Sequence, residues 1–132
     1  MSTAEMLATH PSGGSVDGAT LARAIDAALA CSHTCTACAD ACLGEPDVAA
    51  VQRCIRDDLD CSDVCIATSR VLSRQTAGDP ALTRALLEAC IQACDTCAAS
   101  CNEHRDQHEH CRVCGDACEA CGQACRAVLH AL

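Results

Sequence analysis

Apolar positions recur at steps of three and four residues in four segments of this chain, and most of them are Cys. The four rows are Cys31, Cys35, Cys38 and Cys42; Cys54, Asp58, Cys61 and Cys65; Cys90, Cys94, Cys97 and Cys101; and Cys111, Cys114, Cys118, Cys121 and Cys125. At about 100° per residue, these steps keep each row on one face of a helix. The pattern therefore predicts four helices, each presenting a row of thiols.

Turn-forming and capping residues set the expected boundaries of the first two helices. Residues 1–16 include a Pro and two adjacent Gly, and they predict a flexible N-terminal tail with at most one short turn. Residues 17–132 then form the Cys-rich bundle. We expect its first helix over 17–43, ended by Gly44, and its second over 46–76.

The third and fourth helices are separated by a weaker signal. Asp79 followed by Pro80 is a cap with Pro at the first helical position, so a helix begins there. Asp106 followed by Glu109 resembles a capping box, which places the next turn near residues 103–106. One unbroken helix from 80 to 131 also keeps the thiol row in phase and stays open as an alternative.

Short connections make neighbouring helices antiparallel, so the expected fold is an all-α, up-down-up-down four-helix bundle. One end then carries Cys42, Cys54, Cys101 and Cys111, and beyond them His104, His108 and His110. The other end carries Cys31, Cys65, Cys90 and Cys125, and beyond them Leu72, Leu87 and Leu129, with Leu21, Leu86 and Val128 nearby. We expect an apolar plug at the second end and ion entry at the first.

Composition limits the setting and the partners. Half of the 132 residues are apolar but none is aromatic, so the 16 Cys must form much of the core, where free thiols pack as small hydrophobes. Eighteen acidic residues against nine Arg, with no aromatic ring for base stacking, disfavour nucleic acid. No segment has the roughly 20 apolar residues of a membrane span, and the N-terminus does not read as a signal peptide. We therefore expect a cytoplasmic protein with reduced thiols.

The charge of the bound metal favours Cu(I) among the ions that soft thiolates bind. One Cu(I) per thiolate is neutral overall, whereas each Zn(Cys)₄ centre carries about two negative charges into a core with no basic residue on the Cys rows. Two other classes remain open, a zinc or cadmium buffer and an iron–sulfur or thiol redox protein. We expect no enzymatic activity.

The chain resembles the copper storage proteins, specifically their cytosolic type, in C-S-H-T-C-T-A-C-A-D-A-C at 31–42, C-I-Q-A-C-D-T-C-A-A-S-C at 90–101 and H-E-H-C-R-V-C-G-D-A-C-E-A-C-G-Q-A-C at 108–125. The resemblance implies a tetramer of four-helix bundles that sequesters many Cu(I) ions per chain through all 16 Cys. The implied partners are copper ions, further copies of the chain, and a copper chaperone or copper-dependent enzyme as donor or acceptor.

Five other residues are candidate metal ligands at the His-bearing end. They are His104, His108, His110, Asp58 and Asn102. Asp58 replaces a Cys in its row, so it departs from an all-thiol pattern and should face inward. A second apolar stripe on the same helix consists of Val48, Ile55, Leu59 and Ile66, and we expect it to form a subunit interface.

Overall fold

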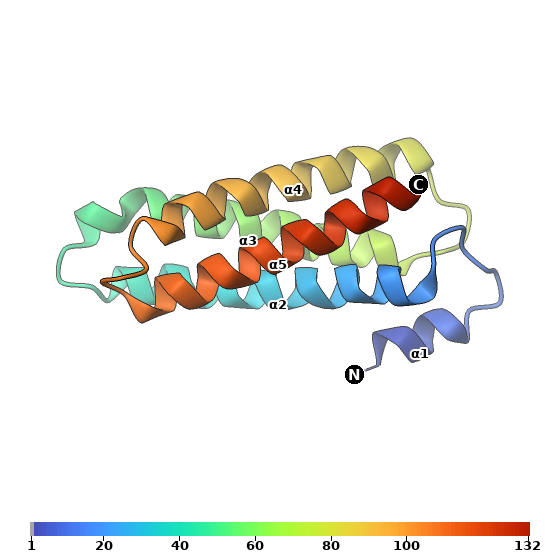
Figure 1. Cartoon of the computed structure of the whole chain (residues 1–132), viewed down its shortest axis with the longest axis horizontal. Helices are drawn as coiled ribbons and strands as arrows, with labels where there is room; N and C mark the ends of the chain where they lie inside the picture. Colours follow the sequence, from blue (N-terminus) through green and yellow to red (C-terminus); the bar gives the residue numbers. More distant parts are fainter. Residues whose placement is uncertain (1) are drawn as a thin grey trace.

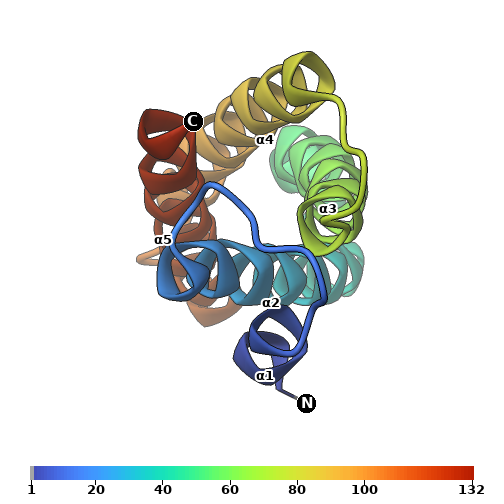
Figure 2. The ribbon, with the colours of Figure 1, turned by 90° about the vertical axis from the view of Figure 1, so that its right-hand side faces the viewer.

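The computed structural model describes residues 2–132, which fold entirely into helices, turns and loops (Figure 1). The elements are α1 (Thr3–Ala8), α2 (Gly18–Leu43), the 3₁₀ helix η1 (Val48–Val51), α3 (Gln52–Ser73), α4 (Pro80–Asn102) and α5 (Glu109–Ala131). Helices α2 and α4 each pack against both α3 and α5, which gives the antiparallel four-helix bundle seen from its end in Figure 2. The predicted fold class is confirmed.

Two of the predicted helix starts are confirmed by their caps. The Asp17 carboxylate accepts a hydrogen bond from the Thr20 backbone N–H at 3.1 Å at the start of α2. The Asp79 carboxylate accepts one from the Ala81 N–H at 2.9 Å at the start of α4. Both side chains satisfy backbone donors that the first helical turn leaves free.

Two other boundaries differ from the prediction. The second helix does not begin at Pro46, because residues 48–51 form η1 and α3 starts at Gln52. Between α4 and α5, residues 103–108 break the helix, which confirms the predicted turn near residues 103–106 and rules out the unbroken alternative. The N-cap of α5 is His108 rather than Asp106, and it forms no side-chain capping bond.

The N-terminal segment has more structure than the single short turn expected. Helix α1 spans six residues, and the Glu5 N–H donates to the Ser2 hydroxyl at 3.2 Å at its start. It lies along α2 (Figure 1), and the Thr3 hydroxyl donates a hydrogen bond to the Asp26 carboxylate of that helix at 2.5 Å. Flexibility of residues 1–16 stays a prediction, and Met1 lies outside the described residues.

Apolar side chains close the bundle at the end where α2 begins, here called the closed end. They are Leu21, Leu72, Leu87 and Val128, each at most 6% exposed. Leu129, expected in this plug, is only half-buried, because Val128 occupies the inward position of α5, and Leu86 is also half-buried. The segment that leads from α1 to α2 crosses this end (Figure 2).

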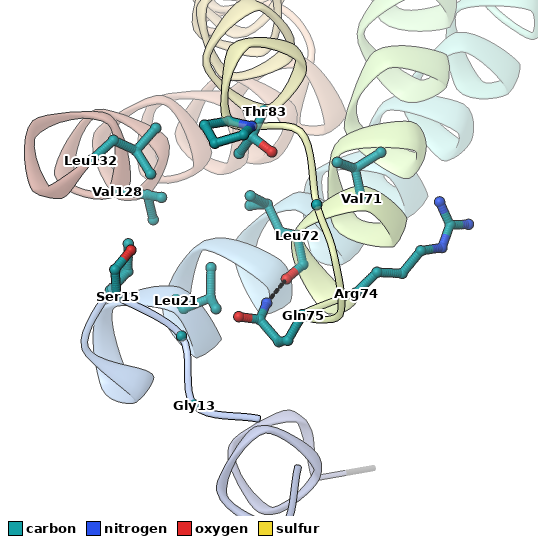
Figure 3. A pocket seen from close by; sticks show the side chains of 14 residues that line it. Gly13, Ser15, Leu21, Val71, Leu72, Arg74, Gln75, Thr83, Val128 and Leu132 are labelled. Atoms are coloured by element: carbon teal, nitrogen blue, oxygen red, sulfur yellow. Dashed lines mark hydrogen bonds between the residues drawn. The ribbon is translucent and has the colours of Figure 1, made fainter. Parts of the chain in front are cut away.

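A cavity of about 280 Å³ lies between that N-terminal segment and the plug (Figure 3). It is lined by Leu21, Leu72 and Val128 on the bundle side and by residues 13–16 from the crossing segment. At the edge of this cavity, the Gln75 side chain donates a hydrogen bond to the Leu72 carbonyl at 2.7 Å.

None of the described helices is long and apolar enough to cross a bilayer.

Candidate metal centre

Every Cys of the chain is a free thiol buried in the core, at most 2% exposed. Helix α2 supplies Cys31, Cys35, Cys38 and Cys42; α3 supplies Cys54, Cys61 and Cys65; α4 supplies Cys90, Cys94, Cys97 and Cys101; and α5 supplies Cys111, Cys114, Cys118, Cys121 and Cys125. The predicted inward direction of all four rows is confirmed. The bundle core is therefore a column of sulfur atoms rather than of aliphatic side chains.

The sulfur atoms form close contacts across the helices. Cys31 Sγ lies 3.8 Å from Cys61 Sγ and 3.7 Å from Cys118 Sγ. Cys54 Sγ and Cys101 Sγ lie 3.4 Å apart. Two metal–sulfur bonds of roughly 2.3 Å placed end to end span about 4.6 Å. An ion between two such thiols therefore needs an outward movement of about 1 Å in total.

These contacts build groups of four ligands whose donor atoms all lie within 4.8 Å of one another. Among them are Cys31, Cys65, Cys94 and Cys121; Cys31, Cys35, Cys61 and Cys118; Cys35, Cys97, Cys114 and Cys118; Cys38, Cys42, Cys54 and Cys111; and Cys38, Cys54, Asp58 and Cys101. Consecutive groups share members such as Cys31 and Cys35, so an ion can pass between groups without leaving its ligands altogether. The arrangement is one extended site along the bundle axis.

Asp58 is an acidic side chain inside the thiol column, and it is fully buried. Its Oδ1 atom accepts hydrogen bonds from the thiols of Cys97 at 3.0 Å and Cys114 at 3.2 Å, and from Cys101 at 3.5 Å. Burial, followed by repulsion from the neighbouring Cys114, raises the pKa of Asp58 to about 8. The expectation that Asp58 faces inward is confirmed, and its carboxyl joins two neighbouring thiol groups.

Burial favours the protonated thiols of Cys42 and Cys111, at the other end of the column from the plug, whereas the hydrogen bond with Cys101 lowers the pKa of their neighbour Cys54. Desolvation is the largest cause that raises the pKa of Cys42, and it raises the pKa of Cys111 to about 11. None of the Arg side chains is buried in the part of the chain that the structure describes. A core without positive charge favours neutral thiols until a metal ion displaces their protons.

Three histidines and Glu45 lie at this second end, here called the His end. His110 Nδ1 lies 3.4 Å from Cys38 Sγ and 3.6 Å from Cys111 Sγ, while His110 Nε2 lies 3.0 Å from a Glu45 carboxylate oxygen. The His108 ring stacks on His110, with centroids 5.4 Å apart. The structure therefore brings His110 directly against the thiols.

The other candidates at this end lie farther from sulfur. His104 is half-buried, and its ring centroid is 6.2 Å from that of His108. The Asn102 amide donates to the Glu119 carboxylate at 3.0 Å, and its oxygen accepts from Arg105 at 2.8 Å. These bonds hold Asn102 between α4 and α5, so the structure does not bring it into the thiol groups.

Glu45 is a residue of this site that sequence reasoning missed. It lies in the turn after α2, 65 positions before His110. Nothing in the local sequence pattern marks it, because only the tertiary fold brings the turn to the start of α5. His110 did carry a signal, since it lies four residues before Cys114 and so shares its helical face.

Structures of known proteins with the same fold have been solved. The copper storage protein Ccsp from Streptomyces lividans, loaded with 10 copper equivalents, is 50% identical and superposes with a TM-score of 0.97 over 99% of this chain and 100% of that one. A cytosolic copper storage protein from the same organism, with five coppers, is 53% identical with a TM-score of 0.85, over 86% of this chain and 95% of that one.

Sequence comparison leads to the same group. A cysteine-rich protein of Bacillus subtilis, YhjQ, described as uncharacterized, is 31% identical over 93 residues, which is 70% of this chain and 81% of that protein. Residues 17–130 match the family model described as copper storage protein. The chain therefore belongs to the copper storage protein family.

Proposed function

We propose that this chain stores Cu(I) in the cytoplasm, as a non-enzymatic protein that binds about one ion per Cys. The observation that carries the proposal is the continuous series of overlapping thiol groups along the core. The solved relatives support it, because one is described as loaded with 10 copper equivalents and another as a cytosolic storage protein. Bridging thiolates allow such a high ratio, since each sulfur is shared between ions.

A zinc buffer is the competing reading, because groups of four thiols also suit tetrahedral zinc. Each Zn(Cys)₄ centre would hold about two negative charges, and removing uncompensated charge from water costs several kcal/mol. Among residues 2–132, the buried groups include two acids, Asp57 and Asp58, and no base. Electrostatics therefore favours the monovalent ion.

Anaerobic titration of the reduced apo-protein with Cu(I), followed by metal analysis and thiol counting, tests the proposal. We expect saturation near one Cu(I) per thiol, observed as thiolate-to-copper absorption in a near-ultraviolet region that is free of Trp and Tyr absorption. Saturation near four ions per chain would contradict copper storage. A parallel titration with Zn²⁺ should reach a ratio near one ion per four thiols and should not displace bound copper.

We assign the ligands to the 16 Cys, Asp58 and the three histidines. Copper enters at the His end, where His104, His108 and His110 are accessible and His110 contacts the thiols. Imidazole binds copper, but it competes for the ion with a large excess of thiolates deeper in the core. An ion bound first at the His end therefore moves inward along the thiol groups that share members. The donor of the ion is a protein such as a copper chaperone, and the later acceptor is a protein such as a copper-dependent enzyme.

We further propose assembly into a tetramer through the outer face of α3 and η1. Leu59 is 47% exposed and Val48 36% exposed, while Ile55 and Ile66 are half-buried beside them. Light scattering after size exclusion tests this proposal: we expect four chains in the native protein and smaller species for Leu59→Asp. Leu82→Asp, at an exposed apolar position on α4, is the matched control and should remain tetrameric. A monomeric native protein would contradict the tetramer.

A further inference from the structure

The backbone of Glu45 is held in one conformation by its neighbours in the chain. Its N–H donates to the Cys42 carbonyl at 3.1 Å, which continues the last turn of α2. The residue before a proline is restricted to extended conformations, and Pro46 follows directly. The Glu45 side chain is only 25% exposed, so its carboxylate lies in a partly dehydrated place beside the histidines.

The contacts of His110 distinguish its two nitrogens. Nε2 lies 3.0 Å from Glu45 Oε1, and an ionised carboxylate only accepts hydrogen bonds, so Nε2 must carry a proton. In the neutral ring Nδ1 is then unprotonated, and it faces the thiols of Cys38 and Cys111 at 3.4 and 3.6 Å. The His108 ring stacks on His110 at an interplanar angle of 13°, and its Nδ1 lies 3.4 Å from the same Glu45 oxygen, a longer contact than that of His110.

We infer that Glu45 is the positioning residue for copper entry: its carboxylate selects the His110 tautomer whose Nδ1 lone pair points at the thiols. The inference rests on the proposed function and adds a residue to it. When Cu(I) binds between Nδ1 and Cys38, the thiol proton leaves to solvent. Nε2 keeps its proton and continues to donate a hydrogen bond to Glu45. A carboxylate behind a metal-binding histidine fixes both the orientation and the basicity of the ring.

A general attraction between cations and the acidic surface is the alternative, and a matched variant separates the two. Glu103 is an exposed carboxylate at the same end, as the C-cap of α4, and its side chain is not bonded to a histidine. Glu103→Ala removes the same charge as Glu45→Ala without disturbing the His110 tautomer. Glu45→Gln removes the charge but keeps an oxygen that can accept from Nε2.

The experiment follows Cu(I) uptake from its bicinchoninate complex by stopped-flow absorption under anaerobic conditions. We expect Glu45→Ala to slow uptake by about tenfold, the lower end of the range for residues that orient a metal ligand, with unchanged capacity. Glu45→Gln should recover most of the rate, and Glu103→Ala should load like the native protein. Because Glu45 also lies 3.4 Å from His108, the background for the double test is His108→Ala with His110→Ala, in which the further change Glu45→Ala should cause no additional slowing.

Each other result has a distinct meaning. If the native protein does not reach about one Cu(I) per thiol, the proposed function fails. If it fills normally but Glu45→Ala loads equally fast, or Glu103→Ala or Glu45→Gln is as slow as Glu45→Ala, only the role of Glu45 is overturned. Nitrogen-15 NMR of the native apo-protein tests the tautomer independently of any variant: we expect a protonated Nε2 and an unprotonated Nδ1 in His110, and the reverse would overturn the inference.

Discussion

The two ends of the bundle share the same thiol rows and differ in what lies beyond them. At the closed end the rows continue into Leu72 and Leu87, and the N-terminal segment crosses over the apolar plug. At the His end they continue into titratable side chains, with His110 in contact with two thiols and with Glu45. The same helical repeat thus stabilises the fold at one end and exposes ligands at the other.

This difference separates stability from access. Leucine side chains contribute burial and exclude water, but they offer an ion no ligand. Imidazole and carboxylate groups offer ligands, and their partial exposure costs little because water still solvates them. Substitutions at the closed end should therefore change unfolding, whereas substitutions at the His end should change the rate of copper uptake.

Leu87→Ala should have the largest effect on stability. Leu87 is fully buried in the plug, and truncating such a leucine costs about 2–5 kcal/mol. Urea unfolding of the reduced apo-protein measures this loss. Uptake of Cu(I) should keep its native rate, and Leu82→Ala, at a side chain 55% exposed on the same helix, should change stability by less than about 0.5 kcal/mol. A changed uptake rate in Leu87→Ala would place an entrance at the closed end.

Asp58→Asn should stabilise the apo-protein by an amount that depends on pH. The folded-state pKa of Asp58 is raised to about 8 from 3.8. The contribution of protonated Asp58 to the free energy of unfolding is therefore fully present below about pH 4 and is lost as pH rises toward about 8. An amide does not titrate, so the variant should lack this fall and gain roughly a few kcal/mol near pH 7. Thermal unfolding from pH 4 to 8 measures the difference. If the stability advantage of Asp58→Asn over the native protein shrinks with rising pH, the raised pKa of Asp58 is contradicted.

Spacing alone was enough to predict the thiol column. Steps of three and four residues placed all 16 Cys on inner faces, and short connections then required the antiparallel bundle. Asp58 was also predictable as an inward residue, because it occupies a position of the same repeat. The repeat could not show that its oxygen would meet thiols from α4 and α5, since that depends on how the helices are rotated in the bundle.

The sequence was less informative where contacts are made by turns. The plug was predicted with Leu129, but Val128, one position earlier, takes the inward direction on α5. Helix α1 was missed although Ser2 and Glu5 have the spacing of a capping box. Glu45 was missed because its partners lie on another helix, and no local periodicity links a turn to a histidine 65 residues away.

His110→Phe should slow copper uptake by about tenfold, which corresponds to about 1.4 kcal/mol in the barrier. The change removes the nitrogen beside Cys38 and keeps a ring of similar shape. The double variant His104→Phe and His108→Phe should also slow uptake and removal, and both variants should keep total capacity. Stopped-flow absorption measures the rates. His33→Phe, at an exposed position on α2, is the control and should load at the native rate. Normal loading by both His-end variants would contradict the assignment of the entrance to the His end.

Deletion of residues 2–9 should have a small effect on stability and none on uptake, and it tests whether copper is excluded from the closed end. It removes α1, the hydrogen bond from Thr3 to Asp26 and the contact of Leu7 with the core. Losing a single hydrogen bond and a partly buried leucine should cost about 1–2 kcal/mol. Thr3→Ala, which removes the hydrogen bond alone, should cost about 1 kcal/mol.

Uptake kinetics of the same deletion decide the comparison of the two ends. The deletion loosens the segment above the cavity but leaves Leu21, Leu72 and Val128 in place. Because these side chains present no ligand and stay packed, Cu(I) should still enter only at the His end, at the native rate. If the shortened chain fills faster than the full-length one, and still fills when His110 is replaced by Phe, copper has a second entrance under the N-terminal segment.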